Sequence, residues 1–293
     1  MSDLLQVAPE VADALESGRP VVALETSIVG QGLPAPHNLR AARGCEEAVR
    51  EAGAVPATVA VLDGRLRVGL TDPELERIAS GGAVKVSSRD IAAAAVHRSI
   101  GATTVAASVR AAALAGIRFF ATGGIGGVHR GHPEDESADL DEIARSPVAV
   151  FCAGAKIILD LRLTLERLES LAVPVLGFAT DEFPAFYARA SGCPVSARVA
   201  DASDAAAVLR ASWSTGARGV VVAIPPPYEI DGVEEMARRA AAELGEGVGG
   251  GAVTPHLLAR MAELSGGRTL DLNVDLVVNN AGVAAHVARE YSG

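Results

Sequence analysis

Cysteine is scarce in this chain of 293 residues, and the three that occur exclude two ways of stabilising a fold. Cys45, Cys152 and Cys193 are odd in number, far apart and without CxxC spacing. Neither a disulfide framework nor a zinc site is therefore indicated. We expect a reducing, cytoplasmic setting.

Long apolar runs and basic stripes are also missing. No run reaches the roughly 18 residues of a membrane span, and the N-terminal segment lacks the basic region and apolar core of a signal peptide. The formal net charge of -10 and the lack of a basic stripe argue against a nucleic-acid partner. We therefore expect the protein to be neither secreted nor membrane-spanning. The net charge does not exclude a small anionic ligand bound by local groups.

Hydrophobic residues make up 49% of the chain, enough to bury the core of one large domain or two modest ones. Short apolar segments that read as buried strands are 20–29, 58–70, 102–108, 117–124, 148–154, 173–180 and 219–225. Segments with a helical pattern lie between or after them, at 37–53, 88–101, 109–116, 203–216, 231–246, 254–267 and 271–290.

This alternation predicts an α/β fold, an α/β/α sandwich in which helices cover both faces of a mostly parallel sheet. Functional residues are then expected at the carboxyl ends of the strands. The Asp63-Gly64 pair, flanked by apolar segments, predicts a tight antiparallel hairpin with a primed turn. The central sheet should therefore be mixed.

Lysine is nearly absent, because only Lys85 and Lys156 are lysines among 26 lysine and arginine residues. A guanidinium keeps its proton near neutral pH, whereas a desolvated lysine amine can lose it and become a nucleophile. Lys156 lies in the apolar run FCAGAKIILD and is a candidate nucleophile. The alternative is a partly buried lysine that extends its amine to water or pairs with Asp160 one helical turn further on.

The segment TGGIGGVHRG, residues 122–131, follows a predicted strand and has the composition of a ligand loop. Glycine lets backbone amides approach phosphate oxygens closely. A dinucleotide fingerprint fails, since His129 stands where the third glycine belongs and no Walker lysine follows. The alternative is a loop tightened only for packing.

Acidic residues crowd the stretch after this loop, at Glu134, Asp135, Glu136, Asp139, Asp141 and Glu142. One or two carboxylates completed by water and ligand oxygens suit Mg²⁺ or Mn²⁺. The alternative is an acidic helix start, in which Ser137 caps the helix and Asp139 complements its dipole.

Three further residues are candidates by their surroundings. Glu25 lies within a predicted strand of apolar and small residues, which should raise its pKa and suit it to general acid catalysis; an arginine partner is the structural alternative. His129 is a candidate proton shuttle or ligand, or a structural histidine. Asn273 begins the last helical pattern, where its alternative role is a helix cap.

Several segments, in order along nearly the whole chain, resemble the pseudouridine-5'-phosphate glycosidase family, also called the indigoidine synthase A-like family. They include ALETSIVGQGLPAPHN, VKVSSRDI, FATGGIGGVHRG, ESADL, CAGAKIILDL and LNVDLVVNNA. The ordered match is more specific than any single motif. It leads us to predict a single domain over residues 1–293.

The resemblance implies a C-glycosidase that reversibly splits pseudouridine 5'-phosphate into uracil and ribose 5-phosphate, with one manganese ion per subunit, as a homotrimer. It implies Lys156 as the Schiff-base nucleophile, Glu25 as the proton donor and Asp135 as the metal ligand. The residues that it implies as substrate contacts are Lys85, Val105, Thr122, Gly124, His129, Ser137, Ala138, Asp139 and Asn273. Among these, Thr122 and Gly124 would hold the phosphate, and Asn273 would face the base.

Departures from the usual family pattern leave the aglycone open. ETSIVGQG stands where ESTIISHG is common, Ser88 replaces an arginine, and the HPEDE loop is short. The alternative is a C-glycosynthase that joins ribose 5-phosphate to a non-uracil aglycone in secondary metabolism. A Schiff-base aldolase for another phosphosugar and a non-catalytic sugar-phosphate sensor are more distant alternatives.

Overall fold

A mixed, mostly parallel sheet forms the central layer of the computed structural model, which describes residues 4–243 and 253–293. Its strands in chain order are β1 (Leu5–Val7), β2 (Val21–Leu24), β3 (Val55–Leu62), β4 (Arg65–Val68), β5 (Val84–Val86), β6 (Gly101–Thr103), β7 (Phe119–Ala121), β10 (Ala149–Cys152), β12 (Val175–Phe178), β13 (Ala197–Val199) and β14 (Val220–Ala223). Their order in space is β1-β4-β3-β2-β7-β10-β14-β12-β13, and β6 pairs with β3 and β5. Strand β3 pairs antiparallel with β4 and β6, and the other neighbours run parallel.

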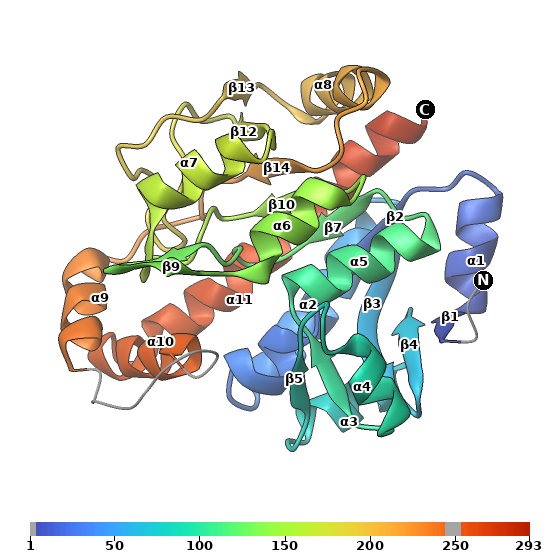
Figure 1. Ribbon diagram of the computed structural model, residues 1–293, viewed down its shortest axis with the longest axis horizontal. Coiled ribbons are helices and arrows are strands. Elements are labelled where there is room, and N and C mark those ends of the chain that lie inside the picture. Colours follow the sequence, from blue (N-terminus) through green and yellow to red (C-terminus); the bar gives the residue numbers. More distant parts are fainter. Residues whose placement is uncertain (1–3, 244–252) are drawn as a thin grey trace.

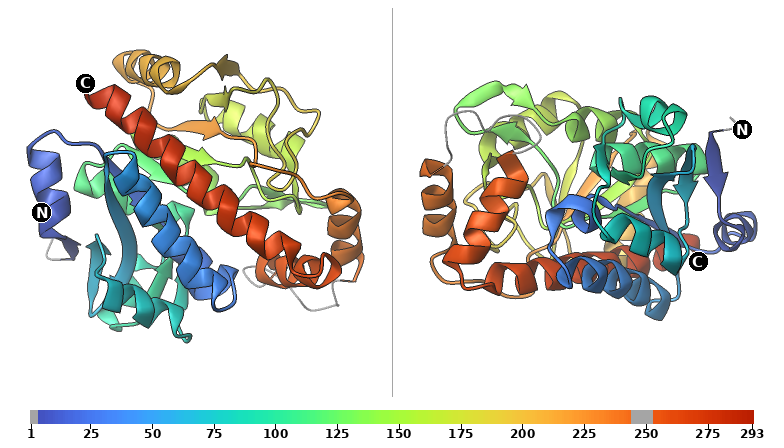
Figure 2. Two further views of the ribbon diagram at one scale, coloured as in Figure 1. Left: turned by 180° about the vertical axis from the view of Figure 1, so that it is seen from behind. Right: turned by 90° about the horizontal axis from the view of Figure 1, so that it is seen from below.

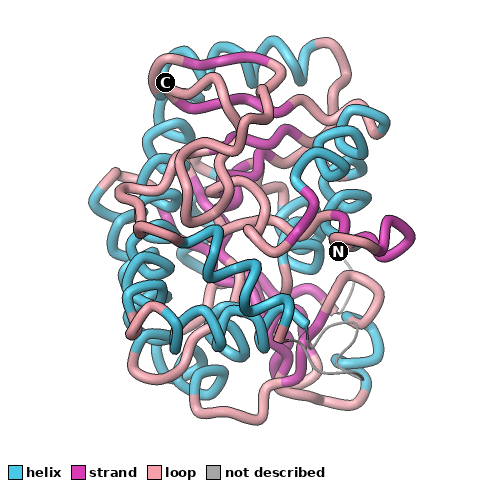
Figure 3. The backbone as a smooth tube through the Cα atoms, turned by 90° about the vertical axis from the view of Figure 1, so that its left-hand side faces the viewer, coloured by secondary structure: helices cyan, strands magenta, loops and turns pink. Residues whose placement is uncertain are grey.

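Helices cover both faces of this sheet, which confirms the predicted α/β/α sandwich. They are α1 (Pro9–Glu16), α2 (His37–Glu51), α3 (Asp72–Ala79), α4 (Ile91–Val96), α5 (Val105–Ala115), α6 (Ala138–Arg145), α7 (Leu161–Ser170), α8 (Ala202–Ser214), α9 (Val233–Ala242), α10 (Val253–Leu264) and α11 (Arg268–Ser292), with a π-helical segment at Ile28–Gly32. Figure 1 shows α5, α6 and α7 in front of the sheet, and Figure 2 shows α2 and α11 across its back. Figure 3 shows the strands enclosed between helices.

The central strands are buried along their whole length, which explains their nearly continuous apolar sequences. Every residue of β2, β3, β10 and β14 is buried. A parallel sheet covered on both faces has no solvent side, so its strands lose the alternation of polar and apolar residues. The same burial holds the carboxyl ends of these strands in place, and the segments that follow them begin there.

Two local predictions from the sequence concern the turn after β3 and the end of β6. Asp63 and Gly64 both have positive φ angles, 53° and 80°, as a primed turn requires, so the predicted hairpin between β3 and β4 is confirmed. The predicted strand at 102–108 is wrong in its second half. The strand stops at Thr103, because the Thr104 side chain accepts a hydrogen bond from the Ala107 amide and begins α5.

A second, antiparallel sheet of three short strands lies over the carboxyl ends of the central ones. Its order is β11 (Leu159–Asp160), β8 (Val128–His129) and β9 (His132–Glu136). Strand β9 is exposed along its length. This small sheet carries His129 and Asp135 out from the glycine-rich segment.

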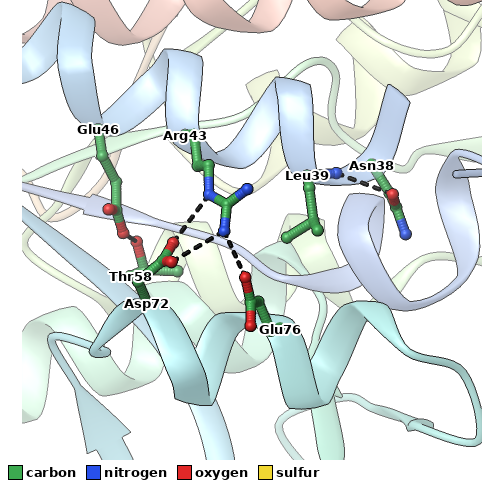
Figure 4. A network of polar contacts seen from close by, with 7 residues as sticks. All are labelled: Asn38, Leu39, Arg43, Glu46, Thr58, Asp72 and Glu76. Atoms are coloured by element: carbon green, nitrogen blue, oxygen red, sulfur yellow. Dashed lines mark hydrogen bonds and ion pairs between the residues drawn. The ribbon is translucent and has the colours of Figure 1, made fainter. Parts of the chain in front are cut away.

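A polar network joins α2 to its neighbours (Figure 4). The Arg43 guanidinium donates to Asp72 at 2.8 Å and to Glu76 at 2.7 Å, which links α2 to α3. The Thr58 hydroxyl of β3 donates to Glu46 of α2. The Arg43 pairs are exposed and screened by solvent, so they set the orientation of the helices more than they stabilise the fold.

The long helix α11 packs on β2, β7 and β10 and ends in an aromatic cluster. Near its C-terminus, the Tyr291 ring lies 5.2 Å from the ring of Trp213 and 5.4 Å from that of Phe119. Arg118 lies over the Trp213 ring at 4.8 Å. Across residues 4–243 and 253–293, no helix has the length and apolar character needed to cross a bilayer.

Candidate active site

Three adjacent parallel strands bring the two central candidates together. Strands β2, β7 and β10 are neighbours, so their carboxyl ends meet at one edge. Glu25 follows β2 directly, and Lys156 follows β10 after a short loop. The prediction that Glu25 lies within a strand is therefore wrong by one position, since β2 ends at Leu24. Ending the strand there turns the carboxylate toward the edge.

A cavity of about 460 Å³ opens at this edge, and it is lined by every residue that the family resemblance implies as catalytic, metal-binding or substrate-contacting. These residues are Glu25, Lys85, Val105, Thr122, Gly124, His129, Asp135, Ser137, Ala138, Asp139, Lys156 and Asn273. Of the acidic stretch, Glu134, Asp141 and Glu142 do not line it. A larger cavity of about 850 Å³ lies between α7 and residues 192–196. It holds none of the implied residues, so the smaller cavity is the candidate active site.

The Glu25 carboxylate is held by two hydroxyl groups. Ser27 donates to its Oε2 and Thr122 donates to its Oε1. Burial raises the pKa of Glu25, while the positive charge of Lys156 and the two hydroxyl groups oppose this rise. Thr122 is thus engaged with Glu25. Ser27 was missed from the sequence, although it lies two residues from Glu25.

Lys156 lies in an irregular loop whose backbone is fixed on both sides. Its amide donates to the Ile125 carbonyl at 3.3 Å, and Arg130 donates to the carbonyls of Ile157 and Leu159, both at 2.9 Å. Asp160 instead accepts from the Leu163 amide and caps α7, so the predicted alternative pairing with Lys156 is wrong. Within the described ranges, no hydrogen bond or ion pair engages the Lys156 amine.

Lys85 lies in the middle of β5, at the exposed rim of the cavity. Partial desolvation and the nearby charge of Lys156 lower the pKa of Lys85. The two lysines of the chain therefore interact electrostatically at one site. The charge of Lys156 thus favours the neutral form of the Lys85 amine.

Two helices begin at the cavity, and Asp139 joins their first turns to the glycine-rich segment. The Asp139 carboxylate is only 6% exposed and accepts from the amides of Ala106 at 2.9 Å and Gly126 at 2.8 Å. Ser137 caps α6 by accepting from the Asp139 amide, which confirms the predicted cap. The starts of α5 and α6, at Val105 and Ala138, direct positive dipole ends into the cavity.

Several amides of the glycine-rich segment are already paired within the protein. The Thr122 amide donates to Phe151, Ile125 to Gly154, Gly126 to Asp139 and Val128 to Thr164. The segment offers fewer donors to a phosphate than its composition predicts. Its glycines also serve packing, because a Cβ on Gly126 would overlap Ser137.

A buried asparagine that was not recognised from the sequence fixes this segment from behind. The side-chain amide of Asn280, on α11, donates to the Thr122 carbonyl at 2.9 Å. Asn280 is fully buried. The backbone next to Glu25 is therefore held by the same helix that carries Asn273.

His129 and Asp135 face each other across the β8–β9 hairpin. The His129 Nδ1 atom lies 3.0 Å from the Asp135 carbonyl oxygen and 3.2 Å from its carboxylate. In the described part of the chain, no three His, Cys, Asp or Glu side chains are grouped as a metal site. One carboxylate on a cavity wall fits a hard divalent ion that completes its shell with water and ligand oxygens.

Asn273 lies in the second turn of α11 and is 4% exposed. Helix α11 begins at Arg268, so the alternative role of Asn273 as its cap is wrong. The side-chain amide of Asn273 donates to the Tyr187 hydroxyl at 3.4 Å, and its Oδ1 atom has no hydrogen-bond partner. Phe186, which also lines the cavity, and Tyr187 were not recognised from the sequence.

Comparison with known proteins identifies relatives over the full length. The family model for indigoidine synthase A like protein matches residues 10–290. A pseudouridine-5'-phosphate glycosidase of Nocardioides sp. is 52% identical, with 99% of this chain and 97% of the relative covered. Among solved structures, the prealnumycin C-glycosynthase AlnA in complex with ribulose 5-phosphate aligns with a TM-score of 0.90 at 40% identity, covering 100% of this chain and 98% of that one. An indigoidine synthase A-like protein of Thermotoga maritima aligns with a TM-score of 0.90 at 32% identity, covering 99% and 97%.

Proposed function

The chain belongs to the indigoidine synthase A-like family, and on that premise we propose that it is a pseudouridine-5'-phosphate glycosidase. It reversibly converts pseudouridine 5'-phosphate into uracil and ribose 5-phosphate. The observation that carries the proposal is the meeting of Lys156, Glu25 and Lys85 in one cavity, beside two helix N-termini.

The scissile bond explains why an amine is needed. Its leaving group is a carbon atom, so protonating an exocyclic oxygen, as in ordinary glycosidases, does not help. In the proposed reaction Glu25 gives a proton to the ring oxygen as the C1'–oxygen bond breaks, and the Lys156 amine adds to C1'. The added nitrogen gives its surplus proton to the Glu25 carboxylate. The C1'–C5 bond then breaks as C5 takes this proton from Glu25 and the lysine nitrogen shares its freed lone pair with C1'. Water hydrolyses the resulting Schiff base and releases ribose 5-phosphate.

At the start of α5 and α6 the amides of Ala106, Ala107 and Asp139 are paired within the protein, which leaves those of Val105 and Ala138 as donors for the 5'-phosphate. Val105 and Ala138 lie in these first turns, and Lys85 adds a positive charge at the rim. We assign the phosphate to these two amides, the two helix dipole ends and Lys85, because the Thr122, Ile125, Gly126 and Val128 amides of the glycine-rich segment are paired within the protein. Binding energy from the phosphate then holds C1' against Lys156.

Asp135 is the proposed ligand of one manganese ion per subunit. The ion, when bound, supplies a positive charge that polarises and orients oxygen atoms of the substrate. His129 contacts Asp135 and orients the carboxylate on its hairpin. The homotrimer is likewise a proposal that follows from the family resemblance, and light scattering of the purified protein measures it. The cytoplasmic location is a proposal that follows from the cysteine pattern.

A C-glycosynthase for another aglycone shares the sugar half of this chemistry. AlnA is such an enzyme, and its complex with ribulose 5-phosphate supports a sugar-phosphate site in the family. Its 40% identity is below the 52% of the glycosidase relative, which favours uracil as the partner base.

The decisive assay measures uracil release from pseudouridine 5'-phosphate with manganese added and with a chelator. We expect turnover with manganese and its loss with the chelator.

Asp135→Asn should raise the manganese concentration for half-maximal rate by about tenfold or more, because the ion loses its carboxylate. Glu134→Gln, on the same exposed hairpin, is the matched control and should behave like the wild type. No uracil release under any condition would contradict the proposed function.

Ser27→Ala tests the hydroxyl groups that hold Glu25. The Ser27 hydroxyl stabilises the carboxylate form, so its removal should raise the pKa of Glu25 further. Since protonated Glu25 is the proposed donor, the alkaline limb of the kcat/KM profile should move to higher pH. Ser27→Thr keeps a hydroxyl and should restore the wild-type limb. A profile that is unchanged in Ser27→Ala would show that this contact is not needed.

A further inference from the structure

The segment 183–188 crosses the carboxyl edge of the sheet and is fixed there by close backbone contacts. The Phe186 amide donates to the Ala153 carbonyl at 2.9 Å, and Ala185 pairs with Gly154. Gly154 has a φ of +75°, and a Cβ there would overlap the Pro184 carbonyl. Only glycine fits this position, so the segment is held tightly next to the Lys156 loop.

Phe186 has an unusual backbone conformation for a bulky residue, with a φ of 61°. Such a conformation is unfavourable and persists only where the surroundings impose it, which occurs most often at functional sites. The Phe186 ring packs on Gly123 and Gly124, and a Cβ on Gly124 would lie 2.6 Å from its Cδ2 atom. Phe186 lines the cavity although it is only 2% exposed, so it supplies an apolar part of the cavity wall.

Asn273 adds a hydrogen-bond acceptor to the same wall. The positions of its Oδ1 atom and of the Phe186 ring are both within 3.6 Å of the point where a Cβ on Gly123 would lie. Its amide group is engaged by the Tyr187 hydroxyl, and its Oδ1 atom is buried without a partner. A buried acceptor without a partner is costly unless a ligand supplies the donor.

We propose that Phe186 determines which aglycone the cavity accepts, and that Tyr187 positions Asn273 so that its Oδ1 atom accepts an N–H group from that aglycone. The ligand class is a planar heterocycle with a ring N–H, of which uracil is the member used by the proposed function. The inference rests on that function. Phe186 contacts the base directly, whereas Tyr187 acts through Asn273 and is a positioning residue.

The test uses steady-state synthesis of pseudouridine 5'-phosphate from uracil and ribose 5-phosphate, with the KM of each substrate measured. Phe186→Leu should raise the KM for uracil about tenfold, because an aliphatic side chain offers no flat face. Tyr187→Phe should raise it about fivefold, because Asn273 is no longer held. In both variants the KM for ribose 5-phosphate should change by less than about twofold.

Two matched controls separate recognition from packing. Phe183→Leu changes a buried ring of the same segment that does not line the cavity, and Tyr228→Phe removes the hydroxyl that contacts Asp275 of α11 on the surface. Both should leave the KM for uracil unchanged. Phe186→Tyr keeps the ring and should restore the wild-type value.

The outcomes distinguish this inference from the proposed function. A wild-type enzyme that neither makes nor cleaves pseudouridine 5'-phosphate overturns the function. An active wild type whose variants change both KM values together, or change neither, overturns the inference alone. An insoluble Phe186→Leu protein also counts against it, since the ring would then be structural.

Discussion

Lys156→Ala is expected to lose uracil release from pseudouridine 5'-phosphate by about 10⁴-fold or more, the scale seen when a covalent nucleophile is removed. The Lys156 amine lines the cavity and is engaged by no hydrogen bond or ion pair in the described residues. Lys85 lies on β5 at the rim of the same cavity and has no covalent role in the proposed reaction. The measurement is kcat with manganese at saturating substrate.

Covalent trapping tests the assignment of Lys156 as the nucleophile without measuring turnover. Borohydride reduction with ribose 5-phosphate should add one sugar-phosphate mass to the peptide that contains Lys156. Lys156→Arg keeps a cation but forms no Schiff base, and should show neither adduct nor activity. Arg162→Ala, outside the cavity, is the control for surface changes. An adduct on Lys85, or an active Lys156→Ala enzyme, would refute the assignment.

Glu25→Gln is expected to lower kcat by about 10²- to 10⁴-fold, the usual contribution of a general acid. Glutamine has nearly the same shape and can still form hydrogen bonds with Ser27 and Thr122. It has no acidic proton to give to the substrate at neutral pH. Glu46→Gln is a matched control, because Glu46 also has a pKa raised by burial and a hydroxyl partner, Thr58, but lies outside the cavity. Its activity should equal that of the wild type.

The stability of Glu25→Gln should depend on pH in a defined direction. The pKa of Glu25 is raised in the folded state, so its contribution to stability is complete below its ordinary pKa of 4.5 and is lost as pH rises through the folded value. Glutamine has no such loss. The Tm of the variant should therefore match the wild type at low pH and exceed it increasingly above pH 4.5. If the variant and the wild type had equal Tm values at every pH, burial of the charged Glu25 carboxylate would not lower stability.

The local sequence was enough to predict the layers of the fold, and the family resemblance supplied candidate site residues that line one cavity. Alternating apolar and helical segments predicted the sandwich, because the strands are buried on both faces and the helices on one. Misplaced boundaries have local causes. Val105 to Ser108 resemble a strand in composition, yet the Thr104 cap begins a helix there. Glu25 has strand-like neighbours but follows the last paired residue.

Contacts between distant segments could not be predicted in the same way. Phe186 packs where glycine stands at 124 and the neighbouring segment fits only glycine at 154, and Asn273 donates to the Tyr187 hydroxyl. None of these pairs has a periodic or spacing signal. The Asp139 side chain shows a further limit, since its acidic helix start was foreseen but its contacts with Ala106 and Gly126 were not.

Helix α11 connects the cavity to the only tryptophan of the chain. Asn273 and Asn280 of this helix contact the cavity and the glycine-rich segment, and near its other end the Tyr291 ring packs edge-to-face against Trp213. Indole emission is sensitive to the packing of neighbouring rings. The fluorescence of Trp213 should therefore report how α11 packs on the sheet, and no added label is needed to follow it.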